Sequence, residues 1–304
     1  MIDVCLLGTG GTMPLPQRAL TSLCLRYNGS LFLTDCGEGT QVQLRKSGFS
    51  MHDIDVILIT HFHADHVTGL QGLLLSMSKS ERKQPVEIIA PQGARHIINA
   101  LCITAPAMPF DVRITELTKP NEHFSIKGLD IQAQLAEHSV ICYAYSFTLH
   151  RSGKFDPKRA IEAGIDVCFW RDLQNGQSIE HNGRLFTPDM VLGSPRKGIK
   201  VTYCTDTRPT ASLAALAKDS DLFICEGMYA DEDKQQMTKE KKHMTFAEAA
   251  WLAKKANADT LWLTHFSPSL SDPYAYEKYA ASLFENTLIP HDLEQTILTF
   301  SARR

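Results

Sequence analysis

Long apolar runs are missing from this sequence of 304 residues, and so is a basic segment near its start. No stretch approaches the roughly 18 consecutive apolar residues that a membrane-spanning helix requires. The first eight residues, Met1 to Gly8, carry an acid at Asp3 and no lysine or arginine. They predict a first β-strand rather than a secretion signal, and we expect no contact with a membrane.

Cysteine pairs with metal-binding or redox spacing are also missing. The eight cysteines include no Cys-x-x-Cys motif, and most of them lie within apolar runs. Without a secretion signal, such cysteines are expected to be reduced and buried, where they act as small apolar side chains. We therefore predict a cytoplasmic location.

An excess of positive charge is missing too. The 31 lysines and arginines are outnumbered by 34 acids, which gives a net charge of −3 with neutral histidines. This balance disfavours indiscriminate binding to nucleic acids but permits a local basic patch. The hydrophobic content of 43% and the charged content of 21% are those of an ordinary globular protein.

Histidines are present in an unusual cluster. The segment His61-Phe62-His63-Ala64-Asp65-His66 directly follows the apolar run Val56–Ile59. On an extended segment, the rings of His61 and His63 point to the same side, and we expect a helix over residues 67–76 to follow. The spacing favours two adjacent metal ions. Nitrogen and carboxylate ligands without a thiolate favour zinc, with manganese or iron as alternatives.

Polar residues end several of the predicted strands. The strands are expected at residues 1–8, 23–27, 31–34, 56–59, 86–90, 111–117, 124–126, 129–136, 200–205, 222–225, 260–263 and 296–300. The polar residues that follow them are Asp35, His61, His138, Asp206, Glu226 and His265. We predict that these strand ends converge, with His61, His63 and His138 on one ion, Asp65, His66 and His265 on the other, and Asp206 bridging. Asp35 is either a carboxylate that orients a ligand histidine or a turn residue.

The order of the predicted elements indicates an α+β fold. Strands alternate with few long helices, which favours two sheets stacked face to face with helices outside. An Asn28-Gly29 turn predicts a hairpin, and Thr245-Phe246-Ala247-Glu248 predicts a capping box at the start of a helix. We expect a single domain over residues 1–304 with an inserted arm at residues 150–198.

The arm differs in composition from its surroundings. Between residues 150 and 200 the apolar periodicity weakens, and nine lysines and arginines face six acids. A segment of this length without regular structure is usually functional or disordered. We interpret it as a protruding arm that contacts phosphates; a solvated charged insertion is the alternative.

Several motifs together resemble a known family. They are Gly8-Thr9-Gly10, Asp35-Cys36-Gly37-Glu38-Gly39-Thr40-Gln41, the histidine cluster, Glu137-His138-Ser139, Asp206-Thr207-Arg208-Pro209 and Thr264-His265-Phe266-Ser267. This pattern is similar, over nearly the whole chain, to the ribonuclease Z branch of the metallo-β-lactamase superfamily. The resemblance implies an αβ/βα sandwich of four layers, two zinc ions per subunit, a homodimer, and removal of the 3′ trailer from precursor tRNA. The arm boundaries, Gly153-Lys154-Phe155-Asp156 and Pro195-Arg196-Lys197-Gly198, resemble those of the family's tRNA-gripping exosite.

The resemblance also implies roles for individual residues. Asp65, His243 and Glu226 are the expected catalytic residues. Asp65 accepts a proton from the attacking water, His243 steadies the phosphate or protonates the leaving oxygen, and Glu226 orients His243. The expected substrate-binding residues are Arg208, Ser267, Lys154 and Phe155, with a purely structural Arg208 as the alternative.

The chain departs from the family pattern in the parts that hold RNA. The exosite lacks the Pro-Pro-Gly-Pro-like turn, and Ser269 stands where an arginine is usual. Two other hypotheses therefore accompany the tRNA-processing one. The first is a phosphodiesterase of the same fold acting on a small or cyclic nucleotide ester. The second is a metal-holding RNA-binding protein without catalysis.

Overall fold

The computed structural model describes residues 1–105, 107–230 and 234–300. Two compact units are present: the main unit comprises residues 1–147 and 200–299, and the small unit comprises residues 148–199 with residue 300. Within the described ranges, every helix falls short of the length and apolar character needed to span a bilayer.

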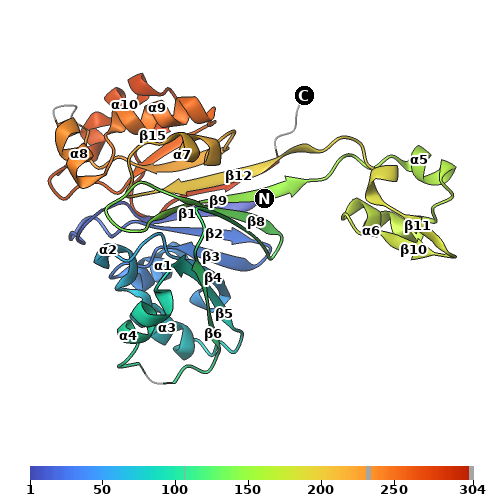
Figure 1. The fold of residues 1–304 in the computed structure, drawn as a ribbon, viewed down its shortest axis with the longest axis horizontal. Coiled ribbons are helices and arrows are strands. Elements are labelled where there is room, and N and C mark those ends of the chain that lie inside the picture. Colours follow the sequence, from blue (N-terminus) through green and yellow to red (C-terminus); the bar gives the residue numbers. More distant parts are fainter. Residues whose placement is uncertain (106, 231–233, 301–304) are drawn as a thin grey trace. The chain divides into compact units, whose positions relative to one another are not determined.

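Two seven-stranded sheets organise the chain (Figure 1). The first sheet has the order β16 (Glu294–Leu298), β1 (Ile2–Gly8), β2 (Ser22–Tyr27), β3 (Ser30–Thr34), β4 (Ile54–Leu58), β5 (Val86–Pro91) and β6 (Val112–Leu117). The second has the order β15 (Thr287–Leu288), β14 (Leu261–Thr264), β13 (Leu222–Glu226), β12 (Arg196–Cys204), β9 (Tyr143–Arg151), β8 (Leu129–Leu135) and β7 (Asn121–Ile126).

Helices cover the outer faces of both sheets. Buried apolar side chains of α1, α3 and α4 pack on the first sheet, and those of α7, α9 and α10 pack on the second. The α-helices of the main unit are α1 (Thr40–Ser47), α2 (Ala64–Val67), α3 (Leu70–Lys79), α4 (Ala94–Leu101), α7 (Ala211–Leu216), α8 (Gln235–Lys241), α9 (Phe246–Ala256) and α10 (Glu277–Leu283). Its short 3₁₀ turns include η1 (Met51–Asp53) and η5 (Pro273–Tyr276).

The inner faces of the two sheets pack against each other. The rings of Phe32 on β3 and Phe147 on β9 meet edge to face, with their centroids 6.4 Å apart. The hydroxyl of Tyr145, also on β9, donates to the carbonyl of Ile59 at 2.7 Å. Helix, sheet, sheet and helix therefore form four layers, and the α+β sandwich predicted from the sequence is confirmed.

Two local predictions, a hairpin turn and a helix cap, are also confirmed. Asn28 and Gly29 join β2 to β3 with φ angles of 49° and 82°, the two positive values of a type I′ hairpin turn. Thr245 and Glu248 form the predicted capping box at the start of α9.

The helix after the histidine cluster differs from the prediction. A continuous helix is predicted over residues 67–76, whereas α2 ends at Val67 and α3 begins at Leu70. Gly69 donates its N–H to the carbonyl of Cys36 at 2.9 Å instead of continuing α2. A Cβ on Gly69 would lie 1.9 Å from the Gly37 carbonyl oxygen. Only glycine permits this crossing, which holds the loop after β3 against the histidine cluster.

Strand β9 is absent from the prediction. No strand is predicted between residues 137 and 199, yet β9 spans Tyr143–Arg151 and β12 begins at Arg196. Residues Tyr143 to Phe147 are all buried, because β9 lies between β8 and β12 inside the sheet. A strand covered on both faces lacks the alternation of polar and apolar residues by which strands are recognised.

The small unit has regular structure and a core of its own. It contains α5 (Pro157–Glu162), η2 (Val167–Phe169), α6 (Trp170–Gln174), the hairpin of β10 (Ile179–His181) with β11 (Arg184–Phe186), and η3 (Pro188–Met190). The buried core residues are Ala160, Ile165, Leu173, Phe186 and Val191. Asp156 caps α5 by accepting from the backbone N–H groups of Lys158 and Arg159.

Candidate metal centre

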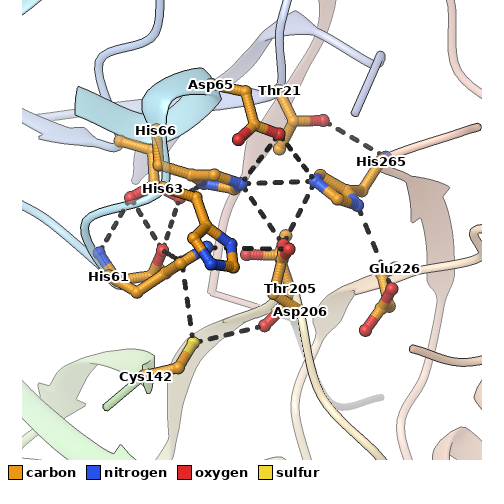
Figure 2. A network of polar contacts seen from close by, with 12 residues as sticks. Thr21, His61, His63, Asp65, His66, Cys142, Thr205, Asp206, Glu226 and His265 are labelled. Carbon is orange, nitrogen blue, oxygen red and sulfur yellow. Dashed lines mark hydrogen bonds and ion pairs between the residues drawn. The ribbon is translucent and has the colours of Figure 1, made fainter. Parts of the chain in front are cut away.

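Parallel neighbouring strands carry the polar side chains of this centre. β3 pairs in parallel with β4, and β13 pairs in parallel with β12 and β14. The carboxyl ends of parallel neighbours lie side by side, so residues far apart in sequence meet there. Asp35 directly follows β3. The residues at the other ends, or within three positions after them, include His61, Asp206, Glu226 and His265 (Figure 2).

Three of these residues adopt a left-handed backbone conformation. The φ angles are 62° at Asp35, 53° at Asp206 and 58° at His265. Such angles are uncommon for residues other than glycine. Each of the three follows the end of a strand, where the backbone turns away and the side chain stays at the sheet edge. Backbone strain of this kind concentrates at functional sites.

The predicted ligands form two groups that share one carboxylate. Atoms of the first group lie within 4.8 Å of one another, as do those of the second. The first group is His61, His63, His138 and Asp206, and the second is Asp65, His66 and His265. Asp206 Oδ1 lies 3.3 Å from His66 Nε2 and 3.1 Å from His265 Nε2. Its other oxygen, Oδ2, lies 3.7 Å from the Nε2 atoms of His61 and His138.

The donor atoms of both groups fit divalent cations. His61 Nε2 and Asp206 Oδ1 are buried and have no hydrogen-bond partner in the described part of the chain. Unpaired buried polar atoms are costly, and a cation at the same point removes that cost. Burial, followed by the neighbouring imidazole of His66, lowers the pKa of His61 well below its ordinary value. A neutral imidazole is the form that binds a metal.

Contacts on the far side of the rings orient the imidazoles. Asp35 Oδ2 lies 2.8 Å from His66 Nδ1, and the carbonyl oxygen of Lys242 lies 3.2 Å from His138 Nδ1. Both oxygens only accept, so each Nδ1 carries the proton and each Nε2 is left to face the centre. Asp35 is held in turn by the backbone N–H and the hydroxyl of Thr60, at 2.8 and 2.9 Å.

Asp35→Asn is expected to weaken metal binding by about 10- to 100-fold, the usual cost of removing such an outer partner. An amide nitrogen facing His66 Nδ1 favours the tautomer with the proton on Nε2, which blocks the metal. Competition with a chromophoric chelator measures the affinity. Asp3→Asn is the control, since Asp3 pairs with Arg26 away from the centre. Equal affinities for both variants would contradict the orienting role of Asp35.

His243 and Glu226 form a pair at the edge of the centre. His243 Nδ1 lies 2.9 Å from Glu226 Oε2, and Glu226 Oε1 accepts from the backbone N–H of Thr207 at 2.5 Å. Burial by itself disfavours the imidazolium. The charge of Glu226 and its hydrogen bond outweigh burial and raise the pKa of His243 to about 9. His243 therefore carries two ring protons at neutral pH, with one of them on Nε2.

The expected substrate-binding residues lie in different surroundings. Arg208 directs its guanidinium to the Glu248 carboxylate and to the backbone carbonyl of His243. This placement corresponds to the structural alternative, in which the arginine supports the loop of His243. The Ser267 hydroxyl lies 2.9 Å from that of Ser269. Lys154 and Phe155 belong to the small unit, where the Phe155 ring packs 5.2 Å from the Trp170 ring.

Several supporting residues are absent from the sequence prediction. Thr60 holds Asp35 and lies 3.0 Å from His61 Nδ1, and the Tyr203 hydroxyl donates to Asp35 at 3.2 Å. Lys242 orients His138 through its backbone carbonyl, which no side-chain pattern reveals. The position of Thr60, directly before His61, is the one signal that pointed to its role.

Comparison with known proteins decides the family. Residues 2–156 match the family model of the anti-Pycsar protein Apyc1, and residues 179–266 match that of the β-lactamase superfamily domain. Ribonuclease Z of Lachnospira eligens is 50% identical over 300 residues, which cover 99% of each chain. The chain belongs to the ribonuclease Z family. Ribonuclease Z of Clostridium acetobutylicum is 47% identical, again over 99% of both chains.

A solved structure agrees with the fold. The short form of human tRNase Z is 24% identical, with a TM-score of 0.71 over 98% of this chain and 99% of that chain. The resemblance to ribonuclease Z stated from the motifs is thereby confirmed, together with the metallo-β-lactamase fold. As a member of the ribonuclease Z family, the chain is a metal-dependent hydrolase with a histidine and aspartate cluster for divalent metal.

Proposed function

We propose that this chain is an endoribonuclease that removes the 3′ trailer from precursor tRNA with two zinc ions. The observation that carries the proposal is Asp206, whose two oxygens face two separate groups of ligands. His61, His63 and His138 would hold one ion, and Asp65, His66 and His265 the other. A pair of such cations supplies activation of a water molecule and neutralisation of the phosphate charge.

The acid and base roles are assigned to His243, which follows α8, and to Asp65, which lies in α2. Asp65 Oδ2 accepts from the backbone N–H of Thr12 at 2.6 Å, and the neighbouring imidazoles of His265 and His66 outweigh burial to hold the Asp65 pKa well below its usual range. The lowered pKa keeps Asp65 ionised at neutral pH, but it also makes the carboxylate a weak base. Its proposed role as the proton acceptor therefore depends on the acidity that two metal ions would give the attacking water. His243, protonated through its pairing with Glu226, donates from Nε2 to the leaving 3′ oxygen.

The small unit contributes the proposed grip on RNA. Residues 150–198 serve in this proposal as the inserted arm of the single domain, and Lys154 with Phe155 contacts the tRNA. Nine lysines and arginines against six acids between residues 150 and 200 support contacts with phosphates. The proposal includes a homodimer in the cytoplasm, as the resemblance to the family implies.

Cleavage of precursor tRNA after the discriminator base is expected from the purified, zinc-loaded protein. Chelation should abolish it, and zinc should restore it. Deletion of residues 152–196 is expected to lower kcat/KM on this RNA by about 10²-fold, the size associated with lost positioning. The same deletion should leave hydrolysis of bis(p-nitrophenyl) phosphate in place, as measured by release of p-nitrophenol.

Two experimental results would each favour a different function. A protein that splits the small diester and leaves precursor tRNA intact is a phosphodiesterase for small or cyclic nucleotide esters. A protein that splits neither, but binds RNA as tightly after Asp65→Ala as before, is an RNA-binding protein without catalysis. Manganese or iron in place of zinc would change the metal and leave the reaction as proposed.

A further inference from the structure

Lys242 has a backbone conformation that its residue type does not favour. It follows the last residue of α8, and its φ angle is 58°. The residue after a helix often adopts this left-handed conformation, but glycine or asparagine usually fills the position. Lysine pays a steric cost there, because its Cβ approaches the following carbonyl. Asn257, at the end of α9, shows the residue type that the same position normally takes.

The neighbours of Lys242 belong to the metal centre. The next residue is His243, whose backbone N–H donates to the Thr238 carbonyl at 2.8 Å and so continues the helix end. On the other side, Lys242 and His138 contact each other twice across 104 positions of sequence. His138 Nδ1 donates to the Lys242 carbonyl at 3.2 Å, and Lys242 Nζ donates to the His138 carbonyl at 3.3 Å.

The loop that carries His138 needs such support. His138 is buried, whereas Glu137 and the three residues after His138, Ser139 to Ile141, are exposed. One backbone hydrogen bond holds the loop just before His138. The backbone carbonyl of Glu137 accepts from the backbone N–H of Arg208 at 3.0 Å. The ammonium of Lys242 donates a hydrogen bond to the His138 carbonyl itself, directly before the exposed residues 139–141.

A comparison with glycine isolates what the lysine adds. Glycine at position 242 would adopt the same backbone angles without strain and would keep the carbonyl that orients the imidazole of His138. What glycine would lose is the ammonium on the His138 carbonyl. The lysine side chain therefore contributes a contact to the His138 loop that glycine could not make.

We propose that Lys242 is a positioning residue for the metal ligand His138. Its two contacts fix His138 with Nε2 toward Asp206 and His63, at 3.7 and 3.3 Å. The same turn carries His243, so Lys242 sets the spacing between one metal ligand and the proposed acid. The spacing between His138 and His243 rests on the proposed function. The positioning of His138 does not, because it concerns metal affinity alone.

The test compares two lysines with the same backbone conformation. Lys127, with a φ angle of 54°, lies in the turn between β7 and β8 and pairs with Asp55 at 3.3 Å. Lys242→Gly and Lys127→Gly both relieve left-handed strain, but only the first removes a contact to the centre. Zinc affinity is measured by competition with a chromophoric chelator, and thermal unfolding is measured on the metal-free proteins.

Lys242→Gly is expected to bind zinc about 10-fold more weakly while its metal-free melting temperature is not lowered. Lys127→Gly should keep the affinity of the unmodified protein. Lys242→Asn, which tolerates the left-handed conformation, should lose affinity as Lys242→Gly does, and this excludes added backbone flexibility as the cause. Lys242→Arg, which restores a cation, should recover most of the affinity.

Two results would overturn the assignment. One is unchanged zinc affinity in Lys242→Gly, including the case in which only the KM for RNA rises, since the ammonium then contacts the substrate. The other is an equal loss in Lys127→Gly. Because affinity is measured without substrate, the test remains decisive even if precursor tRNA is not cleaved.

Discussion

Asp206→Asn is expected to lower kcat by about 10³-fold or more and to remove bound metal. Two cations supply several kcal/mol of stabilisation to a phosphoryl transition state, and each 1.36 kcal/mol corresponds to a factor of ten. Asparagine keeps the shape of the side chain. It removes the charge, however, and replaces one of the two oxygens that face the imidazoles of His66, His265, His61 and His138.

Metal content per chain, from elemental analysis, is the direct measurement for this variant, with kcat on the small diester beside it. Asp292→Asn provides a matched control. Asp292 is another aspartate that is partly buried; its carboxylate accepts from the Thr9 hydroxyl at 2.9 Å and the Ala19 backbone N–H at 2.6 Å, outside the ligand groups. If Asp206→Asn kept two metal ions per chain, the bridging role would be wrong.

The convergence of the centre was predictable because it follows from one rule of sheet geometry. Polar residues after buried strands, such as Asp206 and His265, meet when the strands are parallel neighbours. The left-handed backbone at both residues was not predictable, because aspartate and histidine adopt it more often than most residues but still uncommonly. It is imposed by the tertiary structure that surrounds the turn.

The misses have equally specific causes. β9 was hidden because both of its faces are covered, so its buried residues show no alternation. The break between α2 and α3 depends on a crossing with the Gly37 backbone, which a local pattern does not contain. The role of Lys242 depends on a carbonyl group of another loop, and the sequence does not reveal where backbone carbonyls point.

The composition of the arm does not reveal whether it has regular secondary structure. Weak periodicity between residues 150 and 200 suggested either function or disorder, yet the small unit has helices, a hairpin and a buried cluster around Leu173. Its elements are three to six residues long, too short for a helical or strand period to emerge. Its positive charge was visible from the sequence, and this charge is what the proposed contact with RNA requires.

His243→Ala is expected to lower kcat by about 10²- to 10⁴-fold on precursor tRNA while metal content is unchanged, since general acid catalysis contributes that much. The acid form is needed, and the pKa of His243 is about 9, so activity should fall as the pH rises through about 9. Glu226→Gln removes the charge that raises this pKa. The alkaline limb should then move toward the ordinary histidine value of about 6.5.

A pH profile of kcat on the zinc-loaded protein separates this role from a structural one. Glutamine at position 226 retains an oxygen for the Thr207 N–H, so the strand end keeps its hydrogen bond while the charge next to His243 is lost. A loss of activity in Glu226→Gln that is equal at every pH would indicate disturbed packing and contradict the acid role. A limb that moves to lower pH identifies His243 as the proton donor, because glutamine at position 226 carries no titrating group and only the histidine beside it responds to the lost charge.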